Sequence, residues 1–130
     1  MRIFHQSLRN DFLFQIGLRA SNTHDSTEEQ RRFSTAERQD RLCLVAAADP
    51  NADALRLRQN ANVYSALLHS GQHLVHDLRS ERRAWLHVVS GEVALDDLVL
   101  TQGDGVGVSA ERAVAFTARA QAEILLIDVA

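Results

Sequence analysis

The stretch that decides the fold is Gly71–Gly91, GQHLVHDLRSERRAWLHVVSG, with its continuation Glu92–Val108, EVALDDLVLTQGDGVGV. It predicts two strands, a glycine turn, a short hairpin and a Gly-Asp turn. With a period of two, the second strand has two apolar faces, made of Ala84, Leu86 and Val88 on one side and Trp85, His87 and Val89 on the other. A strand of this kind belongs in the middle of a sandwich or barrel, or keeps one face for a partner.

The rest of the chain shows the same pattern of short strands separated by turns. Strands are predicted at residues 41–47, 63–68, 113–118 and 123–129, and about ten short strands in all are expected, with one proline and no long helix. Ser34 followed by Glu37 forms a capping box that predicts one or two helical turns ending near Asp40. The pattern predicts an all-β sandwich or closed barrel.

The N-terminal region differs from the rest. The run Phe12–Leu18, FLFQIGL, is β-like, whereas residues 20–30 are polar and read as a loop. We therefore predict an N-terminal arm and linker over residues 1–29 and a β-barrel over residues 30–130.

Composition narrows the class of protein. The chain has 130 residues, 45% hydrophobic and 24% charged, as expected for one globular domain. The basic residues are scattered and the net charge is −3, which argues against a nucleic-acid partner. Cys43 is the only cysteine, so an internal disulfide and Cys-based zinc sites are excluded. No run near the start is apolar enough for a signal peptide or membrane helix, so we expect a cytoplasmic protein without a membrane partner.

Histidines are the first candidates for a metal site. The four that could contribute are His69, His73, His76 and His87. A catalytic metal commonly needs three converging protein ligands. His73 and His76 have opposite strand parity, and His87 lies on the face opposite Leu86, so convergence is not expected. We predict surface or interface histidines and no bound metal.

Other polar residues favour structural roles. Cys43, between two leucines, is expected to be a small core residue, and Asp96-Asp97 and Gly103-Asp104 are expected to form turns. No nucleophile with a neighbouring base is found, so no catalytic residue is assigned. Asp128 shares a strand face with Ile124 and Leu126. It is interpreted as an end position in water, with a partly buried carboxylate paired with an arginine as the alternative.

Trp85 allows two interpretations. It is either a core residue under the N-terminal segment or an anchor in a protein interface, where tryptophan is enriched. Both remain open from the sequence.

The chain resembles the cupins, and more closely the C-terminal half of the pirin-like bicupins, which include quercetin 2,3-dioxygenase-type proteins. The resemblance covers roughly Phe12 to Ala130. It is carried by the segments 30–34 (QRRFS), 41–46 (RLCLVA), 71–78, 83–93 (RAWLHVVSGEV), 100–105 (LTQGDG) and 124–128 (ILLID). It implies a single cupin-type β-barrel, a jelly roll or double-stranded β-helix, with an N-terminal arm and at most one short helix.

The resemblance also implies what the site should contain. The cupin metal site uses two histidines and a glutamate from one motif and a further histidine from a second. Here His76 falls near the first histidine, while Leu78, Ala84 and Val114 take the places of the others. In the resembled family the metal and the dioxygenase chemistry belong to the N-terminal cupin half, which these residues do not match. We therefore expect no cofactor and a non-catalytic binding or interaction module. The alternative is a metal-dependent dioxygenase or isomerase with rearranged ligands around His76.

Two further expectations concern binding. A small-molecule pocket inside the barrel would be lined by Leu74, His76, Leu78, Leu86, Val88 and Phe116, although a filled core is the stronger expectation. A homodimer is expected because Trp85, Val89, Leu125, Ile127 and Val129 place apolar residues on outward parities. The candidate interface consists of Phe12, Phe14, Ile16, Trp85, His87 and Val89. A separate N-terminal cupin protein could cover the same face instead, as could the arm if it folds back.

Overall fold

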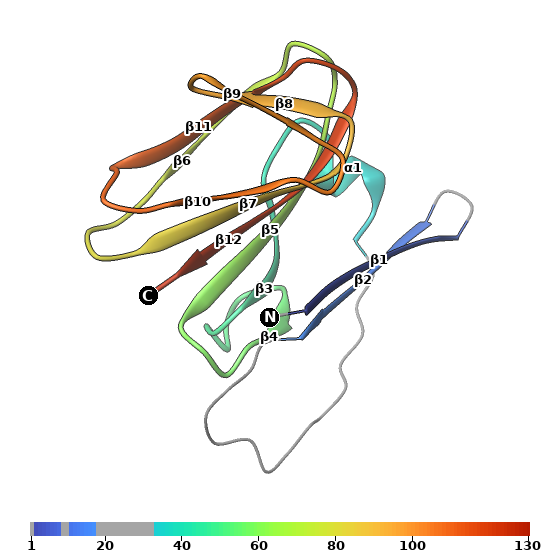
Figure 1. The fold of residues 1–130 in the computed structure, drawn as a ribbon. Helices are drawn as coiled ribbons and strands as arrows, with labels where there is room; N and C mark the ends of the chain where they lie inside the picture. The colour runs from blue at the N-terminus through green and yellow to red at the C-terminus, as the bar shows by residue number, and fades with distance from the viewer. Residues whose placement is uncertain (1, 9–10, 18–32) are drawn as a thin grey trace.

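The computed structural model describes residues 2–8, 11–17 and 33–130, and these form twelve strands and one short helix (Figure 1). The N-terminal elements are β1 (Arg2–Leu8), β2 (Asp11–Gly17), α1 (Thr35–Arg38), β3 (Cys43–Ala47), β4 (Leu55–Arg56) and β5 (Ala61–Leu68). They are followed by β6 (His73–Asp77), β7 (Arg83–Ser90), β8 (Glu92–Leu95), β9 (Leu98–Thr101), β10 (Gly105–Val108), β11 (Ala113–Ala118) and β12 (Ala122–Val129).

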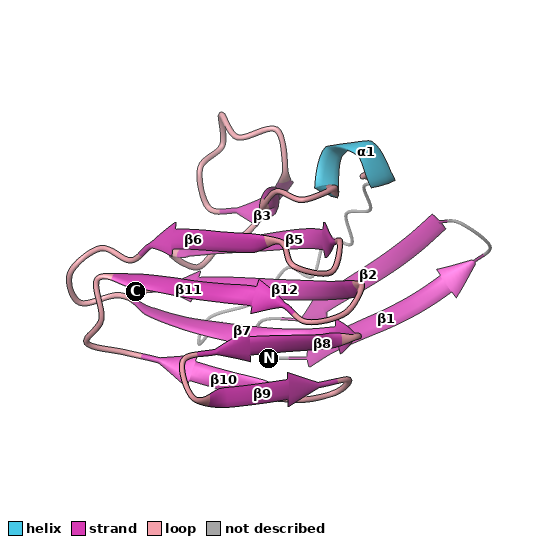
Figure 2. Cartoon of the chain, turned by 90° about the horizontal axis from the view of Figure 1, so that it is seen from above, coloured by secondary structure: helices cyan, strands magenta, loops and turns pink. Residues whose placement is uncertain are grey.

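Two sheets face each other and form the cupin sandwich. One sheet has the order β10-β7-β12-β5-β3-β4 and the other has the order β6-β11-β8-β9. All neighbouring pairs are antiparallel except β3 and β4. Figure 2 shows the strands stacked in these layers. The predicted fold class, an all-β cupin barrel with one short helix, is confirmed.

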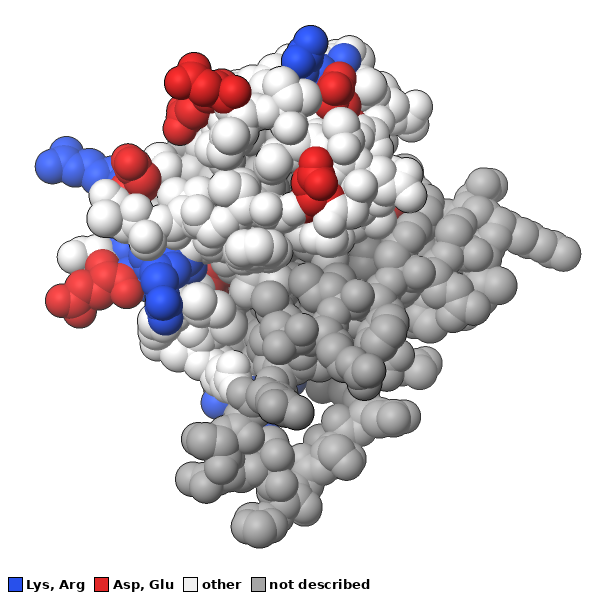
Figure 3. All heavy atoms as spheres, viewed as in Figure 1, with Lys and Arg blue, Asp and Glu red and all other residues white. Residues whose placement is uncertain are grey.

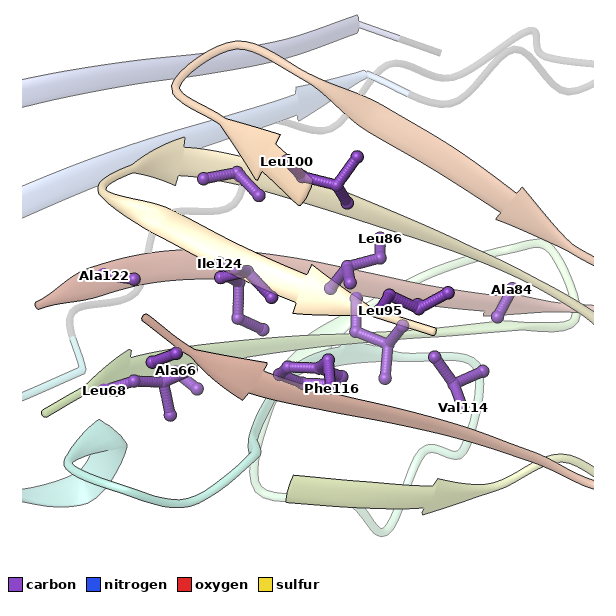
Figure 4. Packing of buried hydrophobic residues seen from close by; sticks show 14 of the residues in the cluster. Ala66, Leu68, Ala84, Leu86, Leu95, Leu100, Val114, Phe116, Ala122 and Ile124 are labelled. Carbon is purple, nitrogen blue, oxygen red and sulfur yellow. The ribbon is translucent and has the colours of Figure 1, made fainter. Parts of the chain in front are cut away.

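The main core lies between the two sheets (Figure 4). β12 lies between β5 and β7, and its residues from Ala122 to Asp128 are all buried. Ala84, Leu86 and Val88 of β7 point into this core, as their strand parity predicts. Most of the expected pocket lining packs there as well: Leu78, Leu86, Val88 and Phe116 are buried members of the cluster, and Leu74 packs against it. These side chains fill the core, which is the stronger of the two expectations.

A second cluster covers part of the outer face of the six-stranded sheet. Its buried members are Val45, Ala46, Val63 and Ile127, with Phe33, Cys43, Leu55, Leu57 and Val129 packed against them. Cys43 is therefore a partly buried packing residue, as expected. Strands β3 and β4 thus extend the sheet from which Ile127 projects, and the segment that contains them adds apolar side chains to its outer face.

The expectation of an exposed apolar patch needs correction. Val89, Leu125 and Ile127 are all buried within the single chain. For Ile127 the cause is the second cluster, because β3 pairs with β5 and brings its own apolar side chains onto the same face. Outward strand parity therefore did not mean exposure to solvent here.

Helix α1 begins with the predicted cap. The backbone N–H of Glu37 donates to Ser34 Oγ at 3.2 Å, and the helix ends at Arg38. The Arg38 side chain is buried and donates from one guanidinium nitrogen to Glu123 Oε2 at 2.8 Å and to Ser65 Oγ at 3.1 Å. This ion pair attaches the helix to β12 and β5.

The acidic turn residues have the expected roles. Asp96 adopts a positive φ of 50° in the β8–β9 hairpin. Asp104 Oδ2 accepts hydrogen bonds from Thr101 N at 2.9 Å and Thr101 Oγ1 at 3.2 Å. Gly91 has φ of 86°, and a Cβ there would overlap the carbonyl oxygen of Gln121. These contacts fix the connections around β8 and β9.

The N-terminal run is a strand, as predicted, but its partner was not foreseen. β2 pairs with β1 in a two-stranded antiparallel sheet, and residues 1–11 gave no periodic signal for β1. The predicted loop at 20–30 and the predicted boundary at 29/30 lie outside the described residues. No helix within the described ranges is long and apolar enough to span a membrane.

Candidate functional site

The site is built around Asp128, near the end of β12. Asp128 is only 5% exposed. Its Oδ1 accepts a hydrogen bond from Arg82 Nε at 2.5 Å, and its Oδ2 lies 2.8 Å from His76 Nε2. The interpretation of Asp128 as an end position in water is wrong, and the paired, partly buried carboxylate is correct. The reason is that β12 is a central strand, covered by its neighbours up to this residue.

Arg82 is held in place by several contacts. It lies in the connection between β6 and β7. One terminal nitrogen donates to Asn60 Oδ1 at 3.0 Å, and the other donates to the Asp128 carbonyl oxygen at 3.2 Å. The guanidinium therefore neutralises the carboxylate and ties the β6–β7 connection to the start of β5.

His76 faces inward and contacts Tyr64. The ring centroids of the two side chains are 4.9 Å apart, and the ring planes are inclined by 56°. Burial, with the Asp128 charge adding to it and the Arg82 charge opposing it, raises the pKa of the Tyr64 phenol. His73, on the opposite face of β6, is exposed and lies 2.8 Å from Thr117 Oγ1. The prediction that His73 and His76 face opposite ways is confirmed.

Two polar atoms of this site have no hydrogen-bond partner among the described residues. Neither His76 Nδ1 nor Tyr64 Oη has a hydrogen-bond partner among the residues that the structure describes, and neither atom is sealed from solvent. Because Nε2 faces a carboxylate, the ring proton of a neutral imidazole belongs on Nε2, which leaves Nδ1 as an acceptor. The site thus offers one acceptor and one hydroxyl on two side chains whose ring centroids are 4.9 Å apart.

The residues present do not fit a cupin metal centre. An imidazole oriented by a carboxylate is a good first ligand. The side chains that take the other ligand places, Leu78, Ala84 and Val114, are hydrocarbons buried in the core. Within residues 33–130 and the two N-terminal strands, no group of three or more His, Cys, Asp or Glu side chains is placed to hold a metal ion.

The remaining candidate histidines are separate from this site. His69 Nδ1 lies 2.7 Å from Asp40 Oδ2, and the His69 backbone N–H donates to Asp40 Oδ1. That backbone hydrogen bond is the main reason why the pKa of Asp40 is lowered. His87 lies on the outer face of β7, and burial lowers its pKa. The four histidines do not converge, as predicted.

Trp85 lies on the outer face and is 40% exposed. A Cβ at Gly105 would overlap its indole ring, and one at Gly107 would come within 3.5 Å of it. Trp85 is therefore not a fully buried core residue, since its ring contacts strand β10 and leaves part of its surface open to solvent. The glycines of β10 make room for an aromatic ring. Of the other candidate interface residues, Phe12, Phe14 and Ile16 lie on β2, where they pair with Ser7, His5 and Ile3.

Residues 44–129 match the family described as the quercetinase C-terminal cupin domain. The chain belongs to this family. It is 31% identical over 101 residues to the quercetin 2,3-dioxygenase of Escherichia coli K12, a match that covers 78% of this chain and 42% of that protein.

Solved structures agree with the quercetinase C-terminal cupin assignment. The crystal structure of YhhW from Escherichia coli has a TM-score of 0.79 and 28% identity, over 92% of this chain and 50% of that one. The structure of the bacterial pirin YhhW in complex with nickel(II) has a TM-score of 0.78 and 29% identity, over 91% of this chain and 50% of that one. The chain spans about half the length of the relatives it matches.

Sequence reasoning identified His76 but missed its surroundings. The sequence did indicate that Asp128 could be buried, since it shares a face with Ile124 and Leu126 on a strand predicted to be interior. Arg82 and Tyr64 carried none, because their approach to Asp128 and His76 depends on how the two sheets stack.

Proposed function

We propose that this protein is a metal-free, non-catalytic cupin module that acts in binding or interaction. The observation that carries the proposal is the chemistry at the ligand positions. Leu78, Ala84 and Val114 have no donor atoms, are 5%, 4% and 1% exposed, and form part of the core. Replacing a packed core by a metal would require new ligands and new space, and neither is provided by these residues.

The names of the relatives do not transfer an activity to this chain. Quercetin 2,3-dioxygenase and the nickel complex describe proteins of which this chain matches 42% and 50% of the length. Because fold and function are separable, similarity over one half supports the fold of that half alone.

The partner that we propose is a second cupin domain, either another copy of this chain or a separate N-terminal cupin protein. Trp85 supports this proposal, because a large, partly exposed aromatic ring on a rigid strand is a typical interface anchor. His87, which is half-buried, follows it on the same face of β7. On the described part of the face shown in Figure 3, side chains of both charge signs are scattered among uncharged ones, which gives no support to a nucleic-acid partner.

A second candidate function rests on the contact between His76 and Asp128. Metal-binding histidines almost always donate their other ring N–H to a carboxylate or carbonyl, and His76 is held in this way. A metal-dependent dioxygenase or isomerase would then use His76 Nδ1 with ligands from outside the described residues.

Elemental analysis of the untagged protein separates the two candidates. The protein would be incubated with nickel(II) or iron(II), desalted, and analysed beside His76→Gln and His73→Gln variants. The proposal expects metal well below one equivalent per chain in all three. One equivalent that is retained in His73→Gln and lost in His76→Gln would refute it and establish the second candidate. The His73 variant is a matched control because that side chain projects from the opposite face of the same strand.

A further inference from the structure

We propose that His76 and Tyr64 form a binding site for an uncharged small molecule that presents an N–H or O–H donor beside a carbonyl acceptor, such as a primary amide. The inference rests on the proposed function in one respect, since His76 Nδ1 must not be occupied by a metal. The inference names the class of ligand that the proposed binding module would take.

The acceptor is His76 Nδ1. Asp128 Oδ2 lies 2.8 Å from the other ring nitrogen, so a neutral ring keeps its proton there and leaves a lone pair on Nδ1. Nδ1 has no partner within the described part of the chain and reaches solvent. A polar atom of a side chain only 13% exposed is poorly placed for full hydration, so a ligand that bonds to it displaces little water.

The donor is the Tyr64 phenol. Its pKa is raised mainly by burial, so the hydroxyl keeps its proton at neutral pH and can donate. Like Nδ1, its oxygen has no hydrogen-bond partner in the described ranges. The ring centroids of Tyr64 and His76 are 4.9 Å apart, so a small ligand could contact both side chains.

The local charge selects an uncharged ligand. Arg82 neutralises Asp128 through Nε, and its two terminal nitrogens donate to Asn60 and to the Asp128 carbonyl oxygen. Neither charge is left to pair with a ligand, and placing an unpaired charge in this half-buried position would be costly. An amide, whose N–H and C=O are adjacent and neutral, matches the two open atoms.

The site is also rigid and backed by apolar side chains. His76 comes from β6 and Tyr64 from β5, so each is carried by a different sheet of the sandwich. The Asp128–Arg82 pair fixes the imidazole, which lowers the ordering cost of binding. Tyr64 and Leu74, which lies two residues before His76 on the same face of β6, are partly buried against the main core.

The test uses benzamide as the probe, followed by NMR. The chain contains one tyrosine, so the aromatic signals of Tyr64 can be read without ambiguity, and the His76 signal is assigned as the one missing from His76→Gln. Two probes of similar size serve as controls. N,N-dimethylbenzamide lacks the N–H donor, and benzoate carries a charge. All titrations are made on protein treated with a chelator, with metal content measured separately on untreated protein.

The expected result is a saturable shift of the Tyr64 and His76 signals with benzamide. Tyr64→Phe, which keeps the ring and leaves the Asp128 contacts intact, should weaken binding about three- to tenfold, and so should the loss of the N–H in N,N-dimethylbenzamide. His73→Gln should bind benzamide like the unaltered protein.

Three results would overturn the proposal: no saturation with benzamide, equal affinity in Tyr64→Phe, or benzoate binding as tightly as benzamide. The last would show that the imidazole carries a positive charge in the site. If His76→Gln fails to fold, the tyrosine variant and the three probes still decide the question. A metal-loaded native protein would defeat the proposed function but would leave these titrations of the metal-free protein readable.

Discussion

His76 and Asp128 join the two sheets of the sandwich through a 2.8 Å contact between Nε2 and Oδ2. His76 belongs to β6 in the four-stranded sheet and Asp128 to β12 in the six-stranded sheet. Such a contact between layers replaces apolar packing at this end of the core. It remains favourable because Arg82 supplies a second partner to the same carboxylate.

Replacement of Arg82 by alanine should destabilise the protein strongly. It would leave the buried Asp128 carboxylate with only a titratable imidazole, at a cost of about 3 kcal/mol. Urea unfolding followed by circular dichroism measures this loss. Arg79→Ala is the matched control, because Arg79 is an exposed residue of the same connection. A loss below about 1 kcal/mol would show that Asp128 reaches solvent in the native state.

The buried pair of Arg38 and Glu123 should behave differently in single and double variants. Both residues are 2% exposed. Arg38→Leu alone removes the cation that pairs with the buried Glu123 carboxylate and should cost about 3 to 5 kcal/mol. Adding Glu123→Leu should recover most of that loss, since an apolar pair avoids desolvation. Denaturant midpoints of the two single variants and the double variant form the cycle, and additive losses would contradict the prediction.

Trp85 and Gly105 should be coupled. Gly105→Ala places a Cβ into the indole ring and should destabilise the protein by about 1 to 3 kcal/mol, as overpacking does. In a Trp85→Ala background the same change should cost far less, because the ring is gone. Trp85→Ala alone should cost less than the roughly 3 to 5 kcal/mol of a fully buried tryptophan. Equal costs of Gly105→Ala in both backgrounds would show that the ring does not rest on β10.

His87 should give the stability a dependence on pH. Burial lowers its pKa in the folded state relative to 6.5. A lowered histidine pKa means that the unfolded chain binds the proton more tightly. Stability from this group is thus complete above pH 6.5 and is lost as the pH falls through the folded-state pKa. His87→Gln should flatten the fall in stability below about pH 6.5, measured by urea unfolding at several pH values. An identical pH profile in the variant would rule out this contribution.

The sequence predicted the strands well, because alternation is a local property. The observed bounds lie within one residue of the expected ones for β7, β11 and β12. The Ser34 cap was predicted from the capping-box motif of residues 34–37. β1 was missed because its polar and apolar residues do not alternate, and its strand conformation comes from pairing with β2.

The site was predictable only in part, for a physical reason. The inward direction of His76 follows from its position on one strand. The partnership with Asp128 depends on the stacking of two sheets, and that of Arg82 on the path of a connection. The exposure of Val89, Leu125 and Ile127 was misjudged for a related reason: strand parity gives a direction but does not say what else in the chain covers that face.

Because Arg38 anchors α1 to the sheet, the structural unit begins earlier in the chain than the family similarity does. The family similarity starts at residue 44, whereas Arg38, six residues earlier in the chain, holds the carboxylate of Glu123 inside β12. A protein trimmed to the recognisable family region would remove the cation and leave the anion in the middle of its sheet. We therefore expect a piece that begins at residue 44 to be less stable than one that includes α1.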